Sequence, residues 1–236
     1  MFTLNSLLDR EKLRRQFQDE DRLSVEGFLS GNGVDALFAN LRSRGDWMEI
    51  FNSGDKLIEL NPTAQQKLTD VQRNELSRAI YAQAREGFQY RYETIRVPDE
   101  AEVRAAMDDV IVRFAEWISG GEAHAFFREI TGFNDIDFAD AQATAYSPGH
   151  FLTGHDDDFP GKNRRAAYVF NLTPVWRTEW GGLLLFHDDA NAISGLVPGF
   201  NRLNIFKVPQ MHSVTEVTQS APYRRYAITG WLRKTG

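Results

Sequence analysis

The chain has 236 residues, of which 42% are hydrophobic and 25% are charged, and its formal net charge is -6. This length suits one domain, or a compact core with a helical addition. The acidic balance argues against nucleic-acid binding as the main role. Because the sequence contains no cysteine, disulfides, iron–sulfur clusters, thiolate zinc sites and cysteine nucleophiles are excluded. Any metal must be held by histidine, aspartate or glutamate.

The N-terminal segment does not have the pattern of a signal peptide. Residues 1–8 carry no basic residue, and Asp9 follows too soon for an apolar h-region. No apolar run in the sequence reaches the roughly 18 residues that a membrane-spanning helix needs. We therefore expect a cytoplasmic protein without a membrane partner, and the sequence does not indicate an oligomeric state.

Helical spacing dominates before residue 135. Apolar residues recur at intervals of three and four, and acidic residues after Pro98 suit a helix N-terminus. Turn residues at 52–55 favour a hairpin. The expected elements in chain order are an extended segment at 23–25, a helix over 30–42, a hairpin over 47–60, and helices over 69–85, 98–119 and 123–130.

After residue 135 the periodicity changes to about two, in short runs separated by glycine, proline, asparagine and aspartate. The expected strands are 142–146, 151–155, 166–172, 183–186, 203–207, 213–217 and 225–231. Short strands without intervening helices favour a sandwich or small barrel over a parallel α/β sheet. We expect an α+β fold with a mainly β core, in which a mainly helical part (1–135) packs on one face of the β part (136–236).

A candidate metal site lies in the β part. His155 and Asp157 stand two positions apart, so on an extended segment both point to one side. His212, on a later strand, supplies a third ligand. Two histidines and one carboxylate form the facial triad of non-haem Fe(II) oxygenases, which leaves other metal positions open. The same three ligands would also suit a zinc hydrolase.

The other histidines are weaker candidates. His187 is followed by Asp188 and Asp189, so it repeats the His-x-Asp pattern. It lies after the glycine pair at 181–182 and lacks the segment that precedes His155. His150 stands in a turn before Phe151. We expect both histidines to lie outside the metal site.

Arg225 is a candidate for binding an acidic co-substrate. Alternation along 225–231 places Arg225, Ala227, Thr229 and Trp231 on one face of the last strand. An unpaired charge among small and apolar neighbours is costly, and a bidentate carboxylate would remove that cost. A structural salt bridge to an aspartate or glutamate is the alternative.

The segment from Tyr146 to Trp231 resembles the Fe(II)- and 2-oxoglutarate-dependent dioxygenases of the prolyl 4-hydroxylase-like group. The matching pieces are Tyr146-Ser147-Pro148-Gly149-His150-Phe151-Leu152 leading to His155-Asp156-Asp157, Arg164 to Thr173, Glu179 to Leu183, and His212-Ser213-Val214 through Arg225 to Trp231. Within this group the segment looks most similar to the bacterial relatives of the ribosomal-protein prolyl hydroxylases.

The resemblance implies a double-stranded β-helix, or jelly-roll, with N-terminal helices on one face. It implies that His155, Asp157 and His212 bind Fe(II) and that Arg225 binds the far carboxylate of 2-oxoglutarate. Tyr146 matches a tyrosine that lines the co-substrate pocket. Asn171 lies where several relatives carry a second pocket tyrosine, and we include it in the cofactor-binding set.

The implied function is hydroxylation of a C–H bond, with a prolyl residue of a protein or peptide as the expected target. O2 and 2-oxoglutarate would be consumed, succinate and CO2 released, and ascorbate is a candidate reductant. A small-molecule hydroxylase that acts on a free amino acid with the same iron centre is one alternative. A non-catalytic sensor of 2-oxoglutarate or metal is another alternative, and a zinc hydrolase is the least favoured one.

Overall fold

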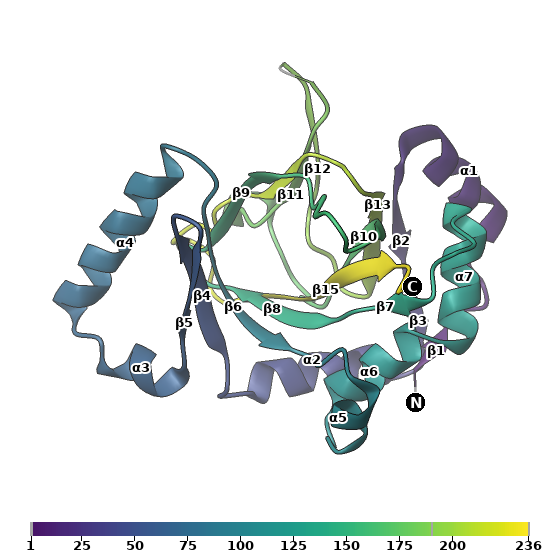
Figure 1. Ribbon diagram of the computed structural model, residues 1–236, viewed down its shortest axis with the longest axis horizontal. Helices are drawn as coiled ribbons and strands as arrows, with labels where there is room; N and C mark the ends of the chain where they lie inside the picture. Colours follow the sequence, from purple (N-terminus) through teal and green to yellow (C-terminus); the bar gives the residue numbers. More distant parts are fainter. Residues whose placement is uncertain (1, 190, 236) are drawn as a thin grey trace.

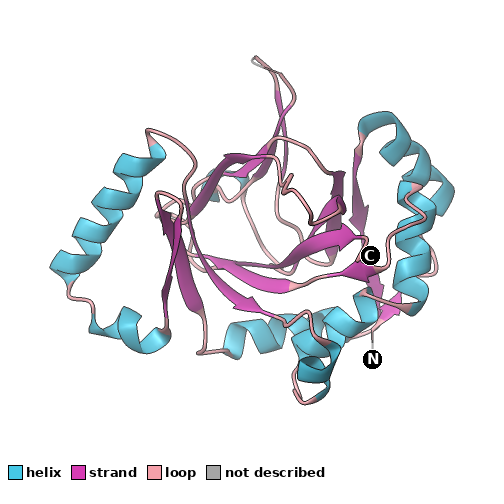
Figure 2. Cartoon of the chain, viewed as in Figure 1, coloured by secondary structure: helices cyan, strands magenta, loops and turns pink. Residues whose placement is uncertain are grey.

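A computed structural model describes residues 2–189 and 191–235. One antiparallel sheet of 13 strands dominates those residues. Ten of its strands follow the order β12-β11-β14-β9-β6-β8-β15-β10-β13-β2, while β4 and β5 extend from β6 and β7 pairs with β15. Figure 1 and Figure 2 show that this sheet curls around a central space, with helices outside it. The predicted α+β fold with a mainly β core is confirmed.

The second half of the chain supplies most strands of the sheet. They are β7 (Phe138–Ala139), β8 (Gln142–Tyr146), β9 (Phe151–His155), β10 (Arg164–Asn171), β11 (Leu184–His187), β12 (Ile193–Leu196), β13 (Arg202–Lys207), β14 (His212–Val214) and β15 (Arg225–Arg233). A short 3-10 helix, Thr178–Trp180, precedes β11. The seven strands expected from alternation are all present, with ends shifted by up to three residues.

The first half of the chain also contributes strands to this sheet. They are β2 (Arg22–Glu26), β4 (Met48–Ser53), β5 (Lys56–Leu60) and β6 (Tyr90–Arg96), while β1 (Thr3–Leu4) and β3 (Leu29–Ser30) form a separate pair. β6 pairs with β4, β8 and β9. The sheet therefore continues across residue 135, and the predicted hairpin over 47–60 is its β4–β5 extension.

Seven α-helices surround the sheet in the described part of the chain. They are α1 (Arg10–Glu20), α2 (Gly33–Ser43), α3 (Pro62–Lys67), α4 (Asp70–Ala84), α5 (Ala101–Ala105), α6 (Val110–Ile118) and α7 (Gly121–Thr131). The single helix predicted over 98–119 is wrong. Asp109 interrupts it, because its side chain accepts a hydrogen bond from Ile111 N and caps α6.

The main hydrophobic core lies between the outer face of the sheet and the helices α1, α2, α6 and α7. Phe114 of α6 stacks on Phe170 of β10 at 5.5 Å between ring centroids, and Phe28 packs edge-on against the same ring. Phe126 and Phe127 of α7 are fully buried beside them. This aromatic layer fixes β10 and β15, the strands that carry one wall of the central cavity.

The helices α3 and α4 lie apart from the others, at the left of Figure 1, against β4–β6. Thr69 and Gln72 form a capping box at the start of α4. The segment after α4 leads directly into β6, which reaches the central cavity. Of the helices that the structure describes, none is both long and apolar enough to span a bilayer.

Candidate metal and co-substrate site

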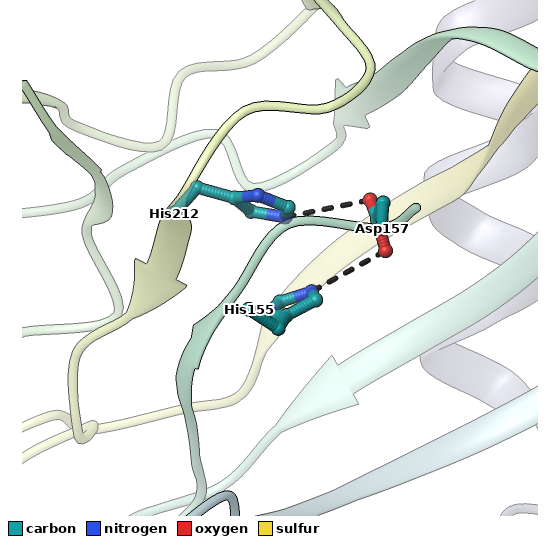
Figure 3. Close-up of side chains that lie close together, drawn as sticks. All are labelled: His155, Asp157 and His212. Atoms are coloured by element: carbon teal, nitrogen blue, oxygen red, sulfur yellow. Dashed lines mark ion pairs between the residues drawn. The ribbon is translucent and has the colours of Figure 1, made fainter. Parts of the chain in front are cut away.

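Three side chains converge inside the curled sheet. His155 ends β9, His212 begins β14, and the two residues are paired across the ladder between these strands. Asp157 faces both rings from one side, with its carboxylate oxygens 3.4 Å from His155 Nε2 and 3.5 Å from His212 Nε2 (Figure 3). Adjacent ligands of a six-coordinate ion with bonds near 2.1 Å stand about 3 Å apart. The spacing fits a divalent metal.

Asp157 reaches this position through an unusual backbone conformation. β9 ends at His155, and Asp157 follows in the loop with φ of 63°, in the left-handed region. Aspartate tolerates this region better than most residues, although at a cost. The convergence of His155 and Asp157 therefore results from a turn, and the strand alternation used to predict it does not extend to Asp157.

The two histidines are oriented in the same way. Nδ1 of His155 lies 3.0 Å from Thr153 O, and Nδ1 of His212 lies 2.7 Å from Gln210 O. A proton on Nδ1, donated to the backbone carbonyl, leaves Nε2 as the free lone pair of each ring. Both Nε2 atoms face Asp157, so the rings present metal-binding nitrogens toward the same point.

The charge states of the site also suit a cation. Burial lowers the pKa of His212 to about 4, so this ring is neutral near pH 7. Burial alone would raise the pKa of Asp157, but its contacts with His155 and His212 lower it below its usual value, so this carboxylate is ionised. Neutral imidazoles and an ionised carboxylate are the forms that ligate metals.

Arg225 lies deep in the same cavity, and none of the described residues is a charge partner for it. It begins β15 opposite Tyr146 of β8, and it is 3% exposed. Its Nε has no hydrogen-bond partner among the described residues, and its Nη2 lies 3.4 Å from Asn171 Oδ1. Burial lowers the pKa of this guanidinium. Among the described residues, neighbouring arginines form ion pairs but Arg225 forms none with an aspartate or glutamate. The alternative of a structural salt bridge is therefore wrong.

Glycines make room for the Arg225 side chain. A Cβ on Gly182 would lie 3.2 Å from Arg225 Cδ, and one on Gly181 would lie 1.9 Å from Glu216 O. Both glycines have positive φ values, 69° for Gly181 and 62° for Gly182. Gly182 therefore sets the space around the buried guanidinium, and Gly181 allows the close approach of the Glu216 backbone.

Tyr146 forms part of the cavity wall beside Arg225. The Arg225 guanidinium carbon lies 5.3 Å from the centre of the Tyr146 ring. Tyr92, from β6, stacks on Tyr146 with 5.2 Å between ring centroids and an angle of 14°. Burial raises the pKa of Tyr92 to about 12 and raises that of Tyr146 still further, so both hydroxyls stay protonated and can donate hydrogen bonds.

Asn171 does not line this cavity. Its Nδ2 donates to Val169 O at 3.3 Å and Arg202 O at 3.2 Å, and the side chain is fully buried at the end of β10. Only its Oδ1 faces Arg225. The structure therefore places Asn171 behind the guanidinium, where it supports Arg225. Asn171 was predicted to bind the co-substrate, but in the structure it can act on the co-substrate only through Arg225.

The cavity has a volume of about 510 Å³ and is lined by the metal-site residues, Tyr146, Arg225 and the inner faces of β6, β10 and β15. Arg164 lies across its opening, with its guanidinium carbon 3.5 Å from the centre of the Trp231 ring and its Nη1 donating to Asp157 O. Phe88 and Phe159 line the opening and are 50% and 61% exposed.

The other histidines lie outside the metal site, as predicted. His187 Nε2 is 2.9 Å from Ser213 Oγ, and Asp188 pairs with Arg22. His150 is buried, with Nε2 3.9 Å from a Glu49 oxygen. In the ranges 2–189 and 191–235, His155, Asp157 and His212 form the single cluster of three metal-ligating side chains.

Sequence reasoning missed the contribution of the first half to the cavity. Phe88, Tyr90, Tyr92 and Arg96 all line it. The alternation of Tyr90, Tyr92 and Thr94 was the available signal for β6. The opposite face of β6 carries Arg91 and Glu93, which form buried ion pairs. Because these residues are charged, the segment does not show the apolar alternation that indicates a buried strand.

Comparison with known protein families finds a match within the β part of the chain. Residues 141–233 match the model of the 2OG-Fe(II) oxygenase superfamily. A region of 116 residues, 46% of this chain, is 30% identical to mouse (Mus musculus) prolyl 3-hydroxylase OGFOD1. That region spans 21% of the length of the mouse protein.

Solved structures share the fold over nearly the whole chain. A Pseudomonas putida prolyl-4-hydroxylase superposes with a TM-score of 0.64 at 16% identity, covering 96% of this chain and 100% of that one. A Trichoplax adhaerens prolyl hydroxylase, solved with a peptide fragment of the hypoxia inducible factor oxygen degradation domain, gives 0.63 at 15% identity, covering 95% and 89%. At these identities the likeness establishes the jelly-roll fold.

Proposed function

We propose that the chain is a 2OG-Fe(II) oxygenase, the superfamily whose model matches residues 141–233, and that it hydroxylates a prolyl residue of a protein or peptide. In this reaction 2-oxoglutarate is converted to succinate and CO2. The observation that carries the proposal is the buried, unpaired guanidinium of Arg225 in the same cavity as the metal triad.

His155, Asp157 and His212 are the residues that would hold Fe(II). When bound, the iron supplies the O2-activating redox chemistry of the family, with electrons from 2-oxoglutarate. The protein contributes the geometry: the three side chains converge on the wall of the cavity, so a metal held by them would be open to the cavity. The backbone carbonyls of Thr153 and Gln210 hold the two rings in the required orientation.

Arg225 would bind the carboxylate of 2-oxoglutarate that lies far from the metal. A guanidinium and a carboxylate form paired hydrogen bonds, and in a buried site this pairing removes the cost of the isolated charge. Tyr146 and Tyr92 form the adjacent wall, and their protonated hydroxyls can donate to the co-substrate. Asn171 keeps the guanidinium in place from behind.

The cavity opening supports a polypeptide as the substrate. Phe88 and Phe159 are large apolar side chains that remain half or more exposed beside the opening. Exposed apolar surface of this kind is typical of binding sites for another chain. The stacked pair of Arg164 and Trp231 gives the inner rim a flat wall, against which the ring of a prolyl residue can pack.

The first test is anaerobic addition of Fe(II) and then 2-oxoglutarate to the purified protein, followed by its visible spectrum. We expect a weak metal-to-ligand charge-transfer band that is absent in His155→Ala. If metal binds without producing the band, the oxygenase proposal fails, and a zinc-type site becomes the better explanation.

A second measurement separates turnover from binding alone. In air, the protein with Fe(II) should consume 2-oxoglutarate slowly even without substrate, with succinate as the product. Failure to form succinate, despite a normal charge-transfer band, would support a sensor. Addition of one oxygen atom to a proline-containing peptide would support the prolyl target, whereas modification of free amino acids alone would favour the small-molecule alternative.

A further inference from the structure

A second groove continues from the opening of the central cavity. It has a volume of about 310 Å³ and runs along the outer end of β6 and β15. Five residues line both spaces: Tyr92, Arg96, Gln142, Arg164 and Trp231. A chain bound at the central opening would therefore extend directly into this groove.

The groove has an excess of positive charge that the described residues do not neutralise. Its cations are Arg96, Lys162, Arg164 and Arg233, and its carboxylates are Asp99 and Asp140. In the described residues the side chains of Arg96 and Lys162 form neither an ion pair nor a hydrogen bond with another group of the protein. This excess contrasts with the net charge of -6 of the whole chain.

Both carboxylates of the groove are already engaged by one arginine. Arg233 forms ion pairs with Asp99 and with Asp140, the latter at 3.0 Å from Nε to Oδ2. The other oxygen of Asp140 accepts a hydrogen bond from Trp231 N at 2.7 Å. Neither carboxylate is free to neutralise Arg96 or Lys162.

Arg164 joins the two spaces. It is held by its stacking on Trp231 and by one hydrogen bond to Asp157 O, which leaves further N–H groups for a ligand. The loop that carries Lys162 also contains the exposed Asp156 and Asp158, but neither of them lines the groove. The cations therefore form a positive wall beside the metal-site opening.

We propose that this groove binds an acidic side chain of the polypeptide substrate, at a position that flanks the hydroxylated residue. The inference rests on the proposed function, because it names the substrate class of the same site. Arg96 and Lys162 are the specificity-determining residues. An aspartate or glutamate of the substrate pairs with them in a partly solvated groove, where opposite charges select the partner and fix its register.

The test uses an alanine-based peptide library with one central proline and one flanking position that carries Asp, Asn or Lys. Binding to the protein loaded with Mn(II) and 2-oxoglutarate is measured by fluorescence anisotropy, and hydroxylation is measured separately with Fe(II) in air. We expect Asp peptides to bind about five-fold or more tighter than matched Asn peptides. The preference should shrink at high salt.

The double variant Arg96→Gln/Lys162→Gln should lose this preference while keeping uncoupled 2-oxoglutarate turnover. The matched control, Lys67→Gln/Arg85→Gln, removes the same charge from the exposed ends of α3 and α4 and should keep the preference. If Asp and Asn peptides bind equally, if no peptide binds, or if the preference survives in the double variant, the inference is overturned. Loss of the charge-transfer band would instead overturn the proposed function.

Discussion

The Nη2 atom of Arg225 lies 3.4 Å from Oδ1 of Asn171, and the described residues offer this guanidinium no other side-chain hydrogen bond. At that length the bond is weak. Arg225 is thus a buried guanidinium whose one side-chain neighbour is an uncharged amide. The carboxylate of a bound ligand would supply the ion pair that the described residues do not.

Replacing this guanidinium should weaken 2-oxoglutarate binding and leave metal binding intact. Removing one partner of a buried charge pair costs about 2–5 kcal/mol, so Arg225→Leu should raise the dissociation constant for 2-oxoglutarate by roughly 30-fold or more. The ligand-free variant should be at least as stable as the wild type, because an unpaired buried charge is removed. Calorimetric titration with Mn(II) present, together with urea unfolding, measures both effects.

Arg224→Leu is the matched control for this variant. Arg224 is the adjacent residue on β15, but it pairs with the buried Glu93 at 2.9 Å. Its loss should destabilise the fold and leave 2-oxoglutarate affinity unchanged. Unchanged affinity in Arg225→Leu would remove Arg225 from the co-substrate site.

Two substitutions at Asp157 should separate its ligand role from its backbone strain. Both Asp157→Ala and Asp157→Gly remove the carboxylate, so Mn(II) should no longer raise the melting temperature of either variant. Because φ at this position is 63°, the glycine variant should be more stable than the alanine variant by about 0.5–1 kcal/mol. Differential scanning calorimetry with and without Mn(II) tests both points.

Asp158→Ala serves as the control, because Asp158 is exposed and lies outside the triad. It should retain the full stabilisation by Mn(II). Retained stabilisation in either Asp157 variant would contradict the three-ligand assignment.

Stability should fall in acid through His150. Burial, together with the nearby positive charges of Arg91 and Arg224, lowers the pKa of this ring to about 3. The unfolded chain takes up a proton near pH 6.5, whereas the folded chain does not, so the unfolded state is favoured below pH 6.5. The contribution of His150 should be complete above pH 6.5 and should decline by about 1.4 kcal/mol per pH unit toward pH 3.

The comparison of His150→Asn with the wild type isolates this contribution. Asp140 acts in the opposite sense, because burial raises its pKa to about 6 and its protonated form favours the folded state in acid. The difference in unfolding free energy between variant and wild type, measured from pH 7 to pH 4, removes the Asp140 effect. Parallel curves would show that His150 is protonated in the folded protein near its ordinary pKa.

Gly230 should not tolerate a side chain. A Cβ at this position of β15 would lie 1.9 Å from Asp140 O, which is far inside contact distance. Gly230→Ala should therefore push β7 away from β15 and cost at least about 3 kcal/mol, in the range of severe overpacking. Gly45→Ala, where nothing lies within 4 Å of the new Cβ, should change the urea midpoint very little; equal midpoints for both variants would contradict the clash.

The cluster of candidate metal ligands could be predicted from the sequence because its residues are few and chemically distinctive. His155 and Asp157 are close in sequence, so a local pattern reveals them, although the turn that joins them could not be foreseen. His212 and Arg225 lie on later strands and were candidates from their residue types, and the resemblance to a known family implied their roles toward Fe(II) and 2-oxoglutarate. Asn171 was assigned to the pocket because it occupies the position of a pocket tyrosine in related sequences. In the structure its amide nitrogen instead donates hydrogen bonds to two backbone carbonyls.

The strands of the first half were harder to predict. β2 and the β4–β5 hairpin followed from apolar alternation and turn residues, but β6 has aromatic residues on its inner face and ion pairs on its outer face. Prediction from alternating apolar and polar residues fails for a strand whose two faces are both partly polar. The long-range pairing that makes such a strand stable is encoded in residues more than forty positions away.

The central place of β6 also bears on how the protein is made. During synthesis from the N-terminus, β6 emerges after β4, which pairs with one of its edges, but well before β8 and β9, which cover the other edge in the finished sheet. Unpaired strand edges are where nascent chains associate wrongly. Charges of alternating sign lie along β6, at Arg91, Glu93 and Arg96. Such charges oppose pairing of the newly made strand with other chains. The same residues that join the two halves of the sheet thus protect the chain until its second half arrives.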